Sequence, residues 1–369
     1  FNRLLYKEKY EEIDRLNNVQ SIVNELWIRK SSDDLLFMIL VLLDIFSDCD
    51  IKSVKSVTSA SNTGFEELKC MCSNCAKEMI DCFSDENCRK ALDCLSNCKG
   101  NDQVCSYRCI TSYESQAFQN FAYCILQKNN CMKYSAKAPQ YPDPIPMTIF
   151  RGKPLTYEVS DDIFIGHINT KPNRITNLID LPILSQSSLI TEDNYNYESY
   201  SWMVICGQNP AYDFFSNQHQ LFYKDIVPKS DNTTRSIFWY DPVFKVTTLN
   251  GEDVWRRRHY RIRRAKTPGS YYFSVIDNGV ASNEYWRILD CDDNLQWAVF
   301  YYSGAASAAG TAYTGALVVS KDGKWPIMTE STTNRIYQAL DRAGIKSWEL
   351  FEVHNEKDYT KSGPPPLDI

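Results

Sequence analysis

Eleven of the fourteen cysteines in this chain lie between residues 70 and 131, where their sulfur atoms could support three kinds of chemistry. Such a cluster can bind a metal ion, exchange electrons with a partner, or crosslink the backbone through disulfides. Zinc sites usually combine two Cys-x-x-Cys pairs, and only CSNC at 72–75 has that form. The density therefore favours a disulfide scaffold in an oxidising compartment, with a metal site or a thiol redox centre as the alternatives.

Two pairs of these cysteines have helical spacing. Cys94 and Cys98 are four residues apart, as are Cys105 and Cys109, so the members of each pair lie on one face of a helix. The segment KGND at 99–102 between the pairs is typical of a turn. Two short helices folded back on each other would place Cys94 beside Cys109 and Cys98 beside Cys105.

The regions around the cysteine cluster differ in composition and in the spacing of their apolar residues. Residues 1–65 predict a helical extension, because their apolar residues recur at three-to-four spacing. A cysteine-rich helical domain covers 66–133, and a proline-containing linker with a polar insertion covers 134–198. The longest apolar stretch, at 35–46, has twelve residues and includes Asp44, whereas a membrane span needs about 20. We interpret it as a buried helix, with docking onto a membrane or a partner protein as the alternative.

After residue 199 the chain is rich in short β-type runs. Segments such as SWMVIC (201–206) and QWAVFYY (296–302) alternate with turn residues at fairly even spacing. This pattern predicts an antiparallel barrel over 199–346 that ends in one helix, followed by a tail over 347–369. The fold class is therefore α+β: a disulfide-rich helical domain followed by a lipocalin-like β-barrel with a C-terminal helix. The interior of such a barrel can hold one apolar ligand.

The charge distribution bears on partners. The net charge of −6 argues against nucleic acid as the main partner. Basic residues concentrate in RRRHYRIRRAK at 256–266, where strand alternation places Tyr260 and Ile262 inward and Arg261 and Arg263 outward. We interpret this run as a solvated basic strand, with contact to anionic lipid or an acidic protein surface as the alternative.

The cysteine spacing and two barrel motifs together resemble those of the violaxanthin de-epoxidase family. From the third cysteine of the cluster onward the gaps run x6, x5, x5, x3, x6, x3, x14, x6, and YPDPIP at 141–146 occupies the position of the family's proline linker. SWMVICGQNPAYDFFSNQHQLF (201–222) is similar to the family's first barrel strand and loop, and FYYSG (300–304) to its tyrosine-pair strand. The similarity covers 66–133 and 200–345.

The resemblance implies a set of disulfide bonds. Carried over residue by residue, the pairs are Cys72–Cys88, Cys75–Cys82, Cys94–Cys109, Cys98–Cys105 and Cys124–Cys131. The family's first cysteine is tied to one in the barrel loop, where this chain has Asn217. Cys70 would then pair with Cys206, Cys49 or Cys291, and we favour Cys206.

The resemblance also implies chemistry on an epoxy-carotenoid, with ascorbate as the reductant and no metal, in a protein of the chloroplast (plastid) thylakoid lumen peripheral to the membrane. Opening an epoxide requires a proton on the departing oxygen, and a carboxyl group in an apolar pocket suits this because desolvation raises its pKa. The implied residues are Glu284 as proton donor, Tyr302 as hydrogen-bond partner of the oxygen, and Asp213 with Gln218 as groups that orient the ring or reductant.

Further expected substrate contacts neighbour these residues in the barrel motifs: Tyr212, Trp286 and Tyr313. Each residue of the main set has a structural alternative. Glu284 could point outward from its strand, Tyr302 could be ordinary packing, and Asp213 could be a turn residue. His219 is expected at the surface of a strand rather than as a switch.

Two functions are consistent with these features. The first is an enzyme on epoxy-carotenoids, either a de-epoxidase or an epoxide isomerase. The second is a catalytically silent carotenoid- or lipid-binding lipocalin that serves as a lumenal subunit or assembly factor of a photosynthetic membrane complex. The polar barrel residues favour chemistry, whereas the N-terminal extension, the insertion and the basic strand favour docking.

Overall fold

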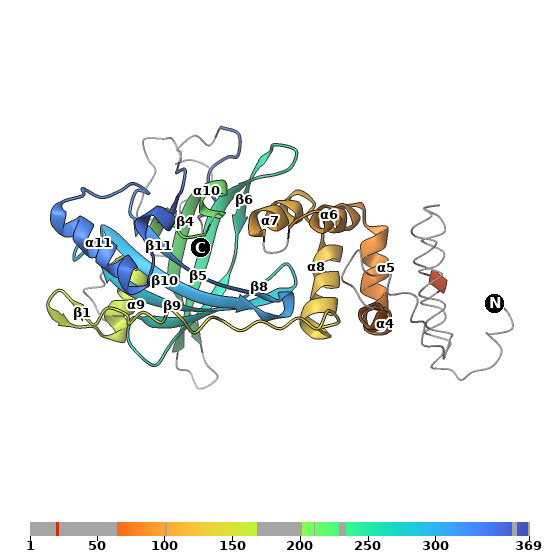
Figure 1. Cartoon of the computed structure of the whole chain (residues 1–369), viewed down its shortest axis with the longest axis horizontal. Coiled ribbons are helices and arrows are strands. Elements are labelled where there is room, and N and C mark those ends of the chain that lie inside the picture. Colours follow the sequence, from red (N-terminus) through yellow and green to blue (C-terminus); the bar gives the residue numbers. More distant parts are fainter. Residues whose placement is uncertain are drawn as a thin grey trace.

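The computed structural model describes residues 20–21, 65–99, 102–167, 201–209, 211–228, 234–355 and 360–367. Apart from residues 20–21, the predicted helical extension lies outside the described residues, as do the apolar stretch at 35–46 and the insertion at 168–198. Within the described ranges, no helix combines the length and apolarity needed to cross a membrane. A helical domain lies at one end of a β-barrel, as Figure 1 shows.

The cysteine-rich segment is helical throughout. Its elements are α4 (Phe65–Asn74), α5 (Ala76–Ser84), α6 (Glu86–Ser96), α7 (Gln103–Ser112), α8 (Gln116–Ala122) and the π-helix η2 (Tyr123–Lys128). Asp85, Asp102 and Ser115 start α6, α7 and α8, because their side chains accept hydrogen bonds from backbone N–H groups of the first turn. The apolar core between the helices is small, so crosslinks must supply much of the stability of this domain.

Five disulfides provide these crosslinks. Cys94–Cys109 joins α6 to α7, and Cys98–Cys105 joins the segment just after α6 to α7. This is the nested arrangement that the helical spacing predicts. The remaining bonds connect different partners from those implied by the resemblance, namely Cys82–Cys88, Cys75–Cys124 and Cys70–Cys131. The disulfide scaffold is therefore present, but Cys70–Cys131 and Cys75–Cys124 join residues that are 61 and 49 positions apart in the sequence.

The predicted pairs Cys75–Cys82 and Cys72–Cys88 are wrong. Cys75 and Cys82 stand at the two ends of α5, and seven residues of helix separate their Cα atoms by about 10 Å, beyond the reach of a disulfide. Cys82 instead meets Cys88 across the tight corner at Asp85, so Cys88 is not available to Cys72.

The predicted pairs Cys124–Cys131 and Cys70–Cys206 are also wrong. Cys124 and Cys131 face the first two helices, because α4 packs against η2 and α5 packs against α8. Cys206 is buried in the barrel under the C-terminal helix, where it belongs to a different apolar cluster from Cys70. The two crosslinks over 61 and 49 residues tie the start of the domain to its end.

Eight antiparallel strands close the barrel and confirm the predicted fold class. They are β3 (Trp202–Gly207), β4 (Ser216–Pro228), β5 (Thr234–Thr247), β7 (Tyr260–Arg264), β8 (Ser270–Asp277), β9 (Val280–Cys291), β10 (Trp297–Ala306) and β11 (Thr311–Ser320). Each strand pairs with the next, and β11 pairs back onto β3. Two short strands extend the sheet: β6 (Asp253–Arg257) pairs with β5, and β12 (Phe351–Glu352) pairs with β3.

Two helices pack on the barrel. On its outer face, the predicted C-terminal helix, α11 (Glu330–Arg342), contributes Ile336, Ala339 and Leu340. The other helix, α9 (Tyr157–Ile165), keeps Glu158 exposed and inserts Phe164 among the interior rings. The sequence assigned α9 to the linker and insertion, so this element was missed. A hairpin of β1 (Ile149–Phe150) and β2 (Lys153–Pro154) precedes it.

Aromatic rings fill the barrel interior near α9. The Phe164 ring stacks on Phe300 with centroids 4.8 Å apart, and it contacts Phe222 and Tyr271 at 4.9 Å each. The indole N–H of Trp202 donates to the carbonyls of Ile163 and Phe164 at 3.0 Å. This end of the interior is therefore packed solid, and any ligand must use the opposite end.

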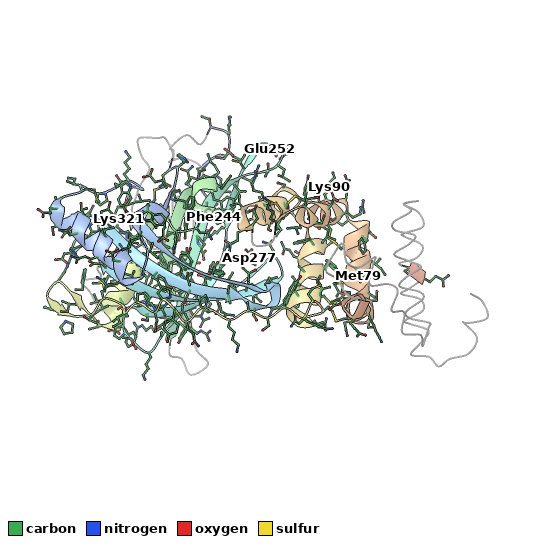
Figure 2. All side chains as sticks on the ribbon, viewed as in Figure 1. Met79, Lys90, Phe244, Glu252, Asp277 and Lys321 are labelled. Carbon is green, nitrogen blue, oxygen red and sulfur yellow. A yellow bond between two sulfur atoms is a disulfide. The ribbon has the colours of Figure 1, made fainter. Side chains whose placement is uncertain are left out.

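The helical domain contacts the strand ends at that opposite end. Arg108 of α7 donates to the backbone carbonyl of Thr247 at 2.9 Å. Arg258 lies 2.7 Å from a carboxylate oxygen of Asp277, and its guanidinium lies 4.4 Å from the ring centroid of Tyr107. Asp277, labelled in Figure 2, marks the barrel end that faces the helices. The backbone of α8 leaves no space for a side chain at Gly279 in the β8–β9 turn.

These contacts correct the interpretation of the basic run at 256–266. Arg256, Arg257 and Arg258 form ion pairs with Glu114, Asp241 and Asp277, respectively. Arg264 pairs with Asp161, so four of the seven Arg and Lys residues in the run are not simply solvated. Its alternation is as predicted: Tyr260 and Ile262 are buried inside the barrel, and Arg263 is exposed.

Candidate active site

Glu284 of β9 points into the barrel, so the outward alternative for this residue is wrong. Its side chain is 9% exposed. The indole N–H of Trp286 donates to its Oε2 at 2.6 Å, and the hydroxyl of Tyr313 donates to its Oε1 at 2.7 Å. Burial raises the pKa of the Glu284 carboxyl above 4.5, and the two hydrogen bonds oppose this effect only in part. The site therefore favours a protonated acid more than water does.

Tyrosine hydroxyls surround this carboxyl. Tyr302 of β10 stacks on Trp286 with ring centroids 5.4 Å apart, and it meets the Tyr313 ring edge-on at 6.2 Å. Its phenol lies close enough to that of Tyr212, on α10 (Ala211–Phe214), for each phenol to affect the pKa of the other. Burial raises the pKa of both phenols, which keeps them neutral and able to donate hydrogen bonds. The structure thus brings four of the predicted residues together around a fifth, the buried acid Glu284.

Three strand glycines make room for this group. A Cβ atom at Gly207 would lie 2.3 Å from the Tyr212 ring, and one at Gly315 would lie 2.5 Å from the Tyr302 hydroxyl. At Gly304 it would lie 2.8 Å from Cγ of Glu284. Glycine inside a strand often marks a close approach of this kind, so VICG, FYYSG and TGAL carried a signal that the sequence interpretation did not use.

We expect Gly304→Ala to push the Glu284 carboxyl away from Tyr313 and to destabilise the barrel by about 1–3 kcal/mol, the usual effect of overpacking. The measurement is the urea midpoint under non-reducing conditions. Adding Glu284→Asp, which shortens the side chain by one methylene, should restore part of the lost stability. Strictly additive effects of the two substitutions would contradict the close contact.

Two further tyrosines complete the site and were missed as functional residues. Tyr240 of β5 donates its hydroxyl to the side chain of Gln220, and its ring lies 5.4 Å from Trp286. The Tyr260 ring lies 5.3 Å from that of Tyr240. Their inward alternation was readable from the strand patterns, but nothing in the sequence placed them beside Glu284.

A family model described as the VDE lipocalin domain matches residues 67–355, which is most of the chain. The chain belongs to the violaxanthin de-epoxidase family. The resemblance seen in the cysteine spacing and barrel motifs is therefore confirmed. No curated protein matches the chain.

Solved structures similar to this violaxanthin de-epoxidase relative are distant. Lobster apocrustacyanin A1 is 11% identical, with 42% of this chain and 76% of that chain covered and a TM-score of 0.27. Insecticyanin from the tobacco hornworm Manduca sexta is also 11% identical, with 46% and 84% covered and a TM-score of 0.31.

The contacts of Gln218 and His219 in this family member are made with other parts of the barrel and not with the Glu284 group. Gln218 is buried, and its amide donates to the backbone carbonyl of Phe215 at 2.7 Å. His219 is fully buried near the Trp255 ring, so the expectation of a surface residue is wrong. Burial lowers its pKa to about 3, which leaves the imidazole uncharged in mild acid. Asp213 lies on α10, but its side chain is outside the described residues.

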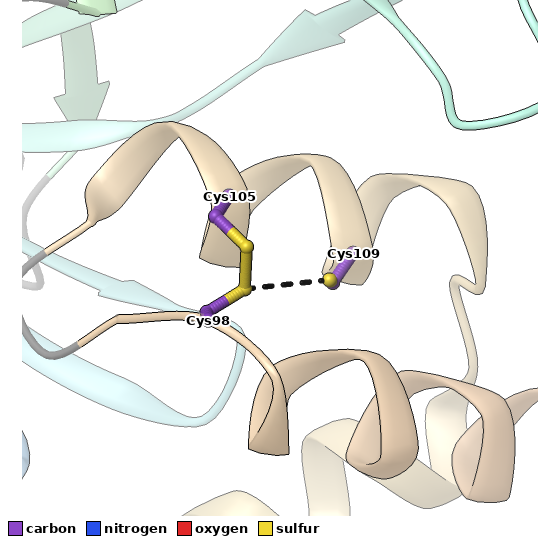
Figure 3. Close-up of side chains that lie close together, drawn as sticks. All are labelled: Cys98, Cys105 and Cys109. Atoms are coloured by element: carbon purple, nitrogen blue, oxygen red, sulfur yellow. Dashed lines mark hydrogen bonds between the residues drawn. A yellow bond between two sulfur atoms is a disulfide. The ribbon is translucent and has the colours of Figure 1, made fainter.

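Among the described residues, one group of side chains has the spacing of metal ligands, and it consists of three cysteines in the helical domain. The sulfur atoms of Cys98, Cys105 and Cys109 lie within 4.8 Å of one another. Figure 3 shows the Cys98–Cys105 disulfide with the Cys109 sulfur 3.7 Å from that of Cys98. Metals bind thiolates, and each of these sulfurs is instead held in a disulfide. In this state the cluster crosslinks two helices and does not offer metal ligands.

The raised pKa of Glu284 predicts a pH dependence of stability. The folded protein keeps this proton at pH values where the unfolded chain has released it, so the stabilisation is fully present below about pH 4.5 and is lost as the pH rises through the folded pKa. Urea midpoints of the wild type should therefore fall more between pH 4.5 and 7 than those of Glu284→Gln, which cannot ionise. An equal or smaller fall in the wild type would contradict a raised pKa of Glu284 in the folded protein.

Proposed function

We propose that this chain opens the epoxide ring of an epoxy-carotenoid in the mouth of its barrel, which is the end opposite α9, with ascorbate as the reductant. The observation that carries the proposal is the buried Glu284 carboxyl, which is held at both oxygens and lies among neutral phenols. A carboxyl group held in its acid form can protonate the epoxide oxygen as the carbon–oxygen bond breaks.

The neighbouring groups have complementary roles in this proposal. Tyr302 donates a hydrogen bond to the epoxide oxygen, because its buried phenol stays neutral. The stacked rings of Trp286 and Tyr302 offer a flat apolar wall against which a carotenoid end ring can lie. Tyr212, whose phenol is the neighbour of Tyr302, helps to orient it. Because α9 and its aromatic neighbours fill the far end, the end ring approaches from the mouth.

The same proton donor could support isomerisation of the epoxide, which needs no reductant. Ascorbate dependence separates the two reactions. The five disulfides support a location in an oxidising space, and with the family they support the thylakoid lumen of a plastid, peripheral to the membrane.

The test is to incubate the purified protein with violaxanthin or diadinoxanthin at about pH 5, because mild acid and a raised carboxyl pKa both favour the protonated form of Glu284. Absorbance and chromatography follow the pigment with and without ascorbate. Conversion to the de-epoxidised pigment that requires ascorbate is the expected result. Conversion without ascorbate would favour isomerisation, and no conversion of either pigment would count against an enzyme.

A second candidate is a silent carotenoid- or lipid-binding lipocalin docked on a photosynthetic membrane complex. An outward array on the barrel favours it: Trp239 stacks on His259 at 4.2 Å, and the Arg261 guanidinium lies 5.2 Å from the Trp239 ring. Nearby on β8, Tyr272 is 48% exposed. Aromatic and arginine side chains of this kind are enriched in protein interfaces. Co-purification in a large complex that is lost in Arg261→Glu, without pigment conversion, would support this candidate.

A further inference from the structure

Glu284 is connected to the barrel rim by a short chain of hydroxyl groups. The Tyr313 hydroxyl donates to Oε1 of Glu284 at 2.7 Å, and the Ser282 hydroxyl lies 2.6 Å from the Tyr313 oxygen. Ser282 stands two residues before Glu284 on the inward face of β9 and is half-buried, whereas Glu284 is buried. The chain therefore runs from the rim inward to the acid.

When Glu284 is ionised, the hydrogens of this chain point in one direction. Tyr313 has one hydroxyl hydrogen, which it gives to Glu284, so the hydrogen shared with Ser282 belongs to the serine. Each donor thus points toward the carboxylate, as expected immediately after Glu284 has given up its proton. Burial raises the pKa of the Tyr313 phenol, so it stays protonated between transfers.

The second hydrogen bond to Glu284, which comes from Trp286, cannot deliver a proton to the carboxylate. Its Oε2 accepts from the indole N–H of Trp286, and an indole donates a hydrogen bond but accepts none. A hydroxyl both donates and accepts, so a proton can enter at Ser282 and leave toward Glu284 through Tyr313. Of the two side chains that hold the acid, Tyr313 alone can pass a proton to it.

The proposed reaction creates a need for such a connection. Removal of an epoxide oxygen as water takes two electrons and two protons. The ascorbate monoanion supplies both electrons and one proton when it is oxidised to dehydroascorbate, so the second proton must come from solvent. Isomerisation has no such net demand, because the proton given to the oxygen is balanced by one lost from carbon.

We propose that Ser282 and Tyr313 form a proton relay that returns a solvent proton to Glu284 after each turnover. The inference rests on the proposed function for its purpose, but the relay itself is a property of the ligand-free protein. Both residues act through Glu284 and not on the substrate, so they are positioning residues. A merely structural Tyr313 would hold the carboxylate in place without affecting how fast its proton exchanges.

The test measures hydrogen–deuterium exchange at Glu284 directly. Infrared difference spectroscopy on ligand-free protein follows the carbonyl stretch of the protonated carboxyl after transfer into D2O, with Glu284→Gln used to assign the band. We expect exchange to slow by about tenfold or more in Tyr313→Phe and Ser282→Ala, because each removes one hydroxyl from the path. Ser282→Thr keeps the hydroxyl and should restore the rate.

The matched control is Ser274→Ala on the neighbouring strand, whose hydroxyl bonds to Asn283 and not to the acid. Its exchange should equal that of the wild type. Equal exchange in Ser282→Ala, Ser274→Ala and the wild type overturns the relay, as does the absence of a protonated Glu284 band between about pH 4 and 7, since a carboxyl with a raised pKa must show one there. Circular dichroism of each variant confirms folding, and Ser282→Ala carries the test if Tyr313→Phe fails to fold.

The outcome is separable from that of the proposed function. Slowed exchange in a protein that converts no pigment would establish the relay and reject the reaction. Pigment conversion with unchanged exchange in all variants would support the reaction and reject the relay. If both stand, turnover of Ser282→Ala should show a larger solvent deuterium isotope effect than that of the wild type.

Discussion

Glu284→Gln should abolish pigment conversion while leaving the barrel folded. The amide has nearly the same shape as the carboxyl, and its oxygen can still accept from Trp286, but it has no proton to give to the epoxide oxygen. Loss of a positioned general acid typically lowers kcat by about 10²–10⁴-fold. The measurement is the initial rate of absorbance change with ascorbate in excess.

Two variants sharpen the interpretation of that result. Glu284→Asp keeps the acid but withdraws it by one methylene, so it should retain partial activity. Glu252→Gln removes a carboxylate from the exposed β5–β6 loop, labelled in Figure 2, and should convert pigment at the wild-type rate. Glu284→Gln with wild-type turnover would show that another group supplies the proton.

The acid also sets the expected pH profile of the activity. Because burial raises the pKa of Glu284, the protonated form persists to higher pH than for an exposed glutamate. The rate should be highest in acid and fall as the pH rises through that pKa. Glu284→Asp should shift the midpoint of this profile, because the shorter side chain changes both burial and the contact with Tyr313.

Local patterns in the sequence predicted much of the scaffold. The i,i+4 cysteine pairs gave the Cys94–Cys109 and Cys98–Cys105 bonds, because both partners lie on adjacent helices joined by a short turn. Strand alternation placed Tyr260 and Ile262 inside the barrel. Interactions of this range depend on residues that are close in the chain, which a single sequence reveals.

Long-range partners account for what was missed. Cys75 bonds to Cys124 over 49 residues. Helical spacing alone excludes the seven-residue alternative, but no local pattern points to Cys124 as the partner. The orientation of Glu284 was predictable, because on a strand it shares one face with Trp286 and Ile288, both of which are buried. Its contact with Tyr313 was not predictable, because it depends on how β9, β10 and β11 align in register.

The helix α9 was missed for a related reason. Its sequence, YEVSDDIFI, carries a charged residue, Asp161, on a face that turns out to be buried. Arg264 and Lys224 pair with this carboxylate at 2.7 and 2.5 Å, and Tyr271 donates to it at 2.6 Å. Buried charge is tolerated when it is paired and hydrogen-bonded, but all three partners lie more than sixty residues away.

The contribution of α9 to the barrel can be measured through Phe164. Its ring contacts Phe222, Tyr271 and Phe300, so Phe164→Ala should destabilise the barrel by about 3–5 kcal/mol, the usual cost of emptying a large buried aromatic site. The urea midpoint under non-reducing conditions, followed by near-ultraviolet circular dichroism, gives the effect. Phe351, on the edge strand β12, is 37% exposed, so Phe351→Ala is the control and should change stability by about 1 kcal/mol or less.

A second measurement shows whether the space is left open. A rigid apolar site emptied of a phenyl ring stays dry and binds small apolar molecules. Benzene should therefore raise the melting temperature of Phe164→Ala and leave that of the wild type unchanged. Loss of stability without a benzene effect would mean that α9 collapses into the space. Equal stability of Phe164→Ala and Phe351→Ala would mean that α9 does not close the barrel, and a ligand could then occupy its whole length.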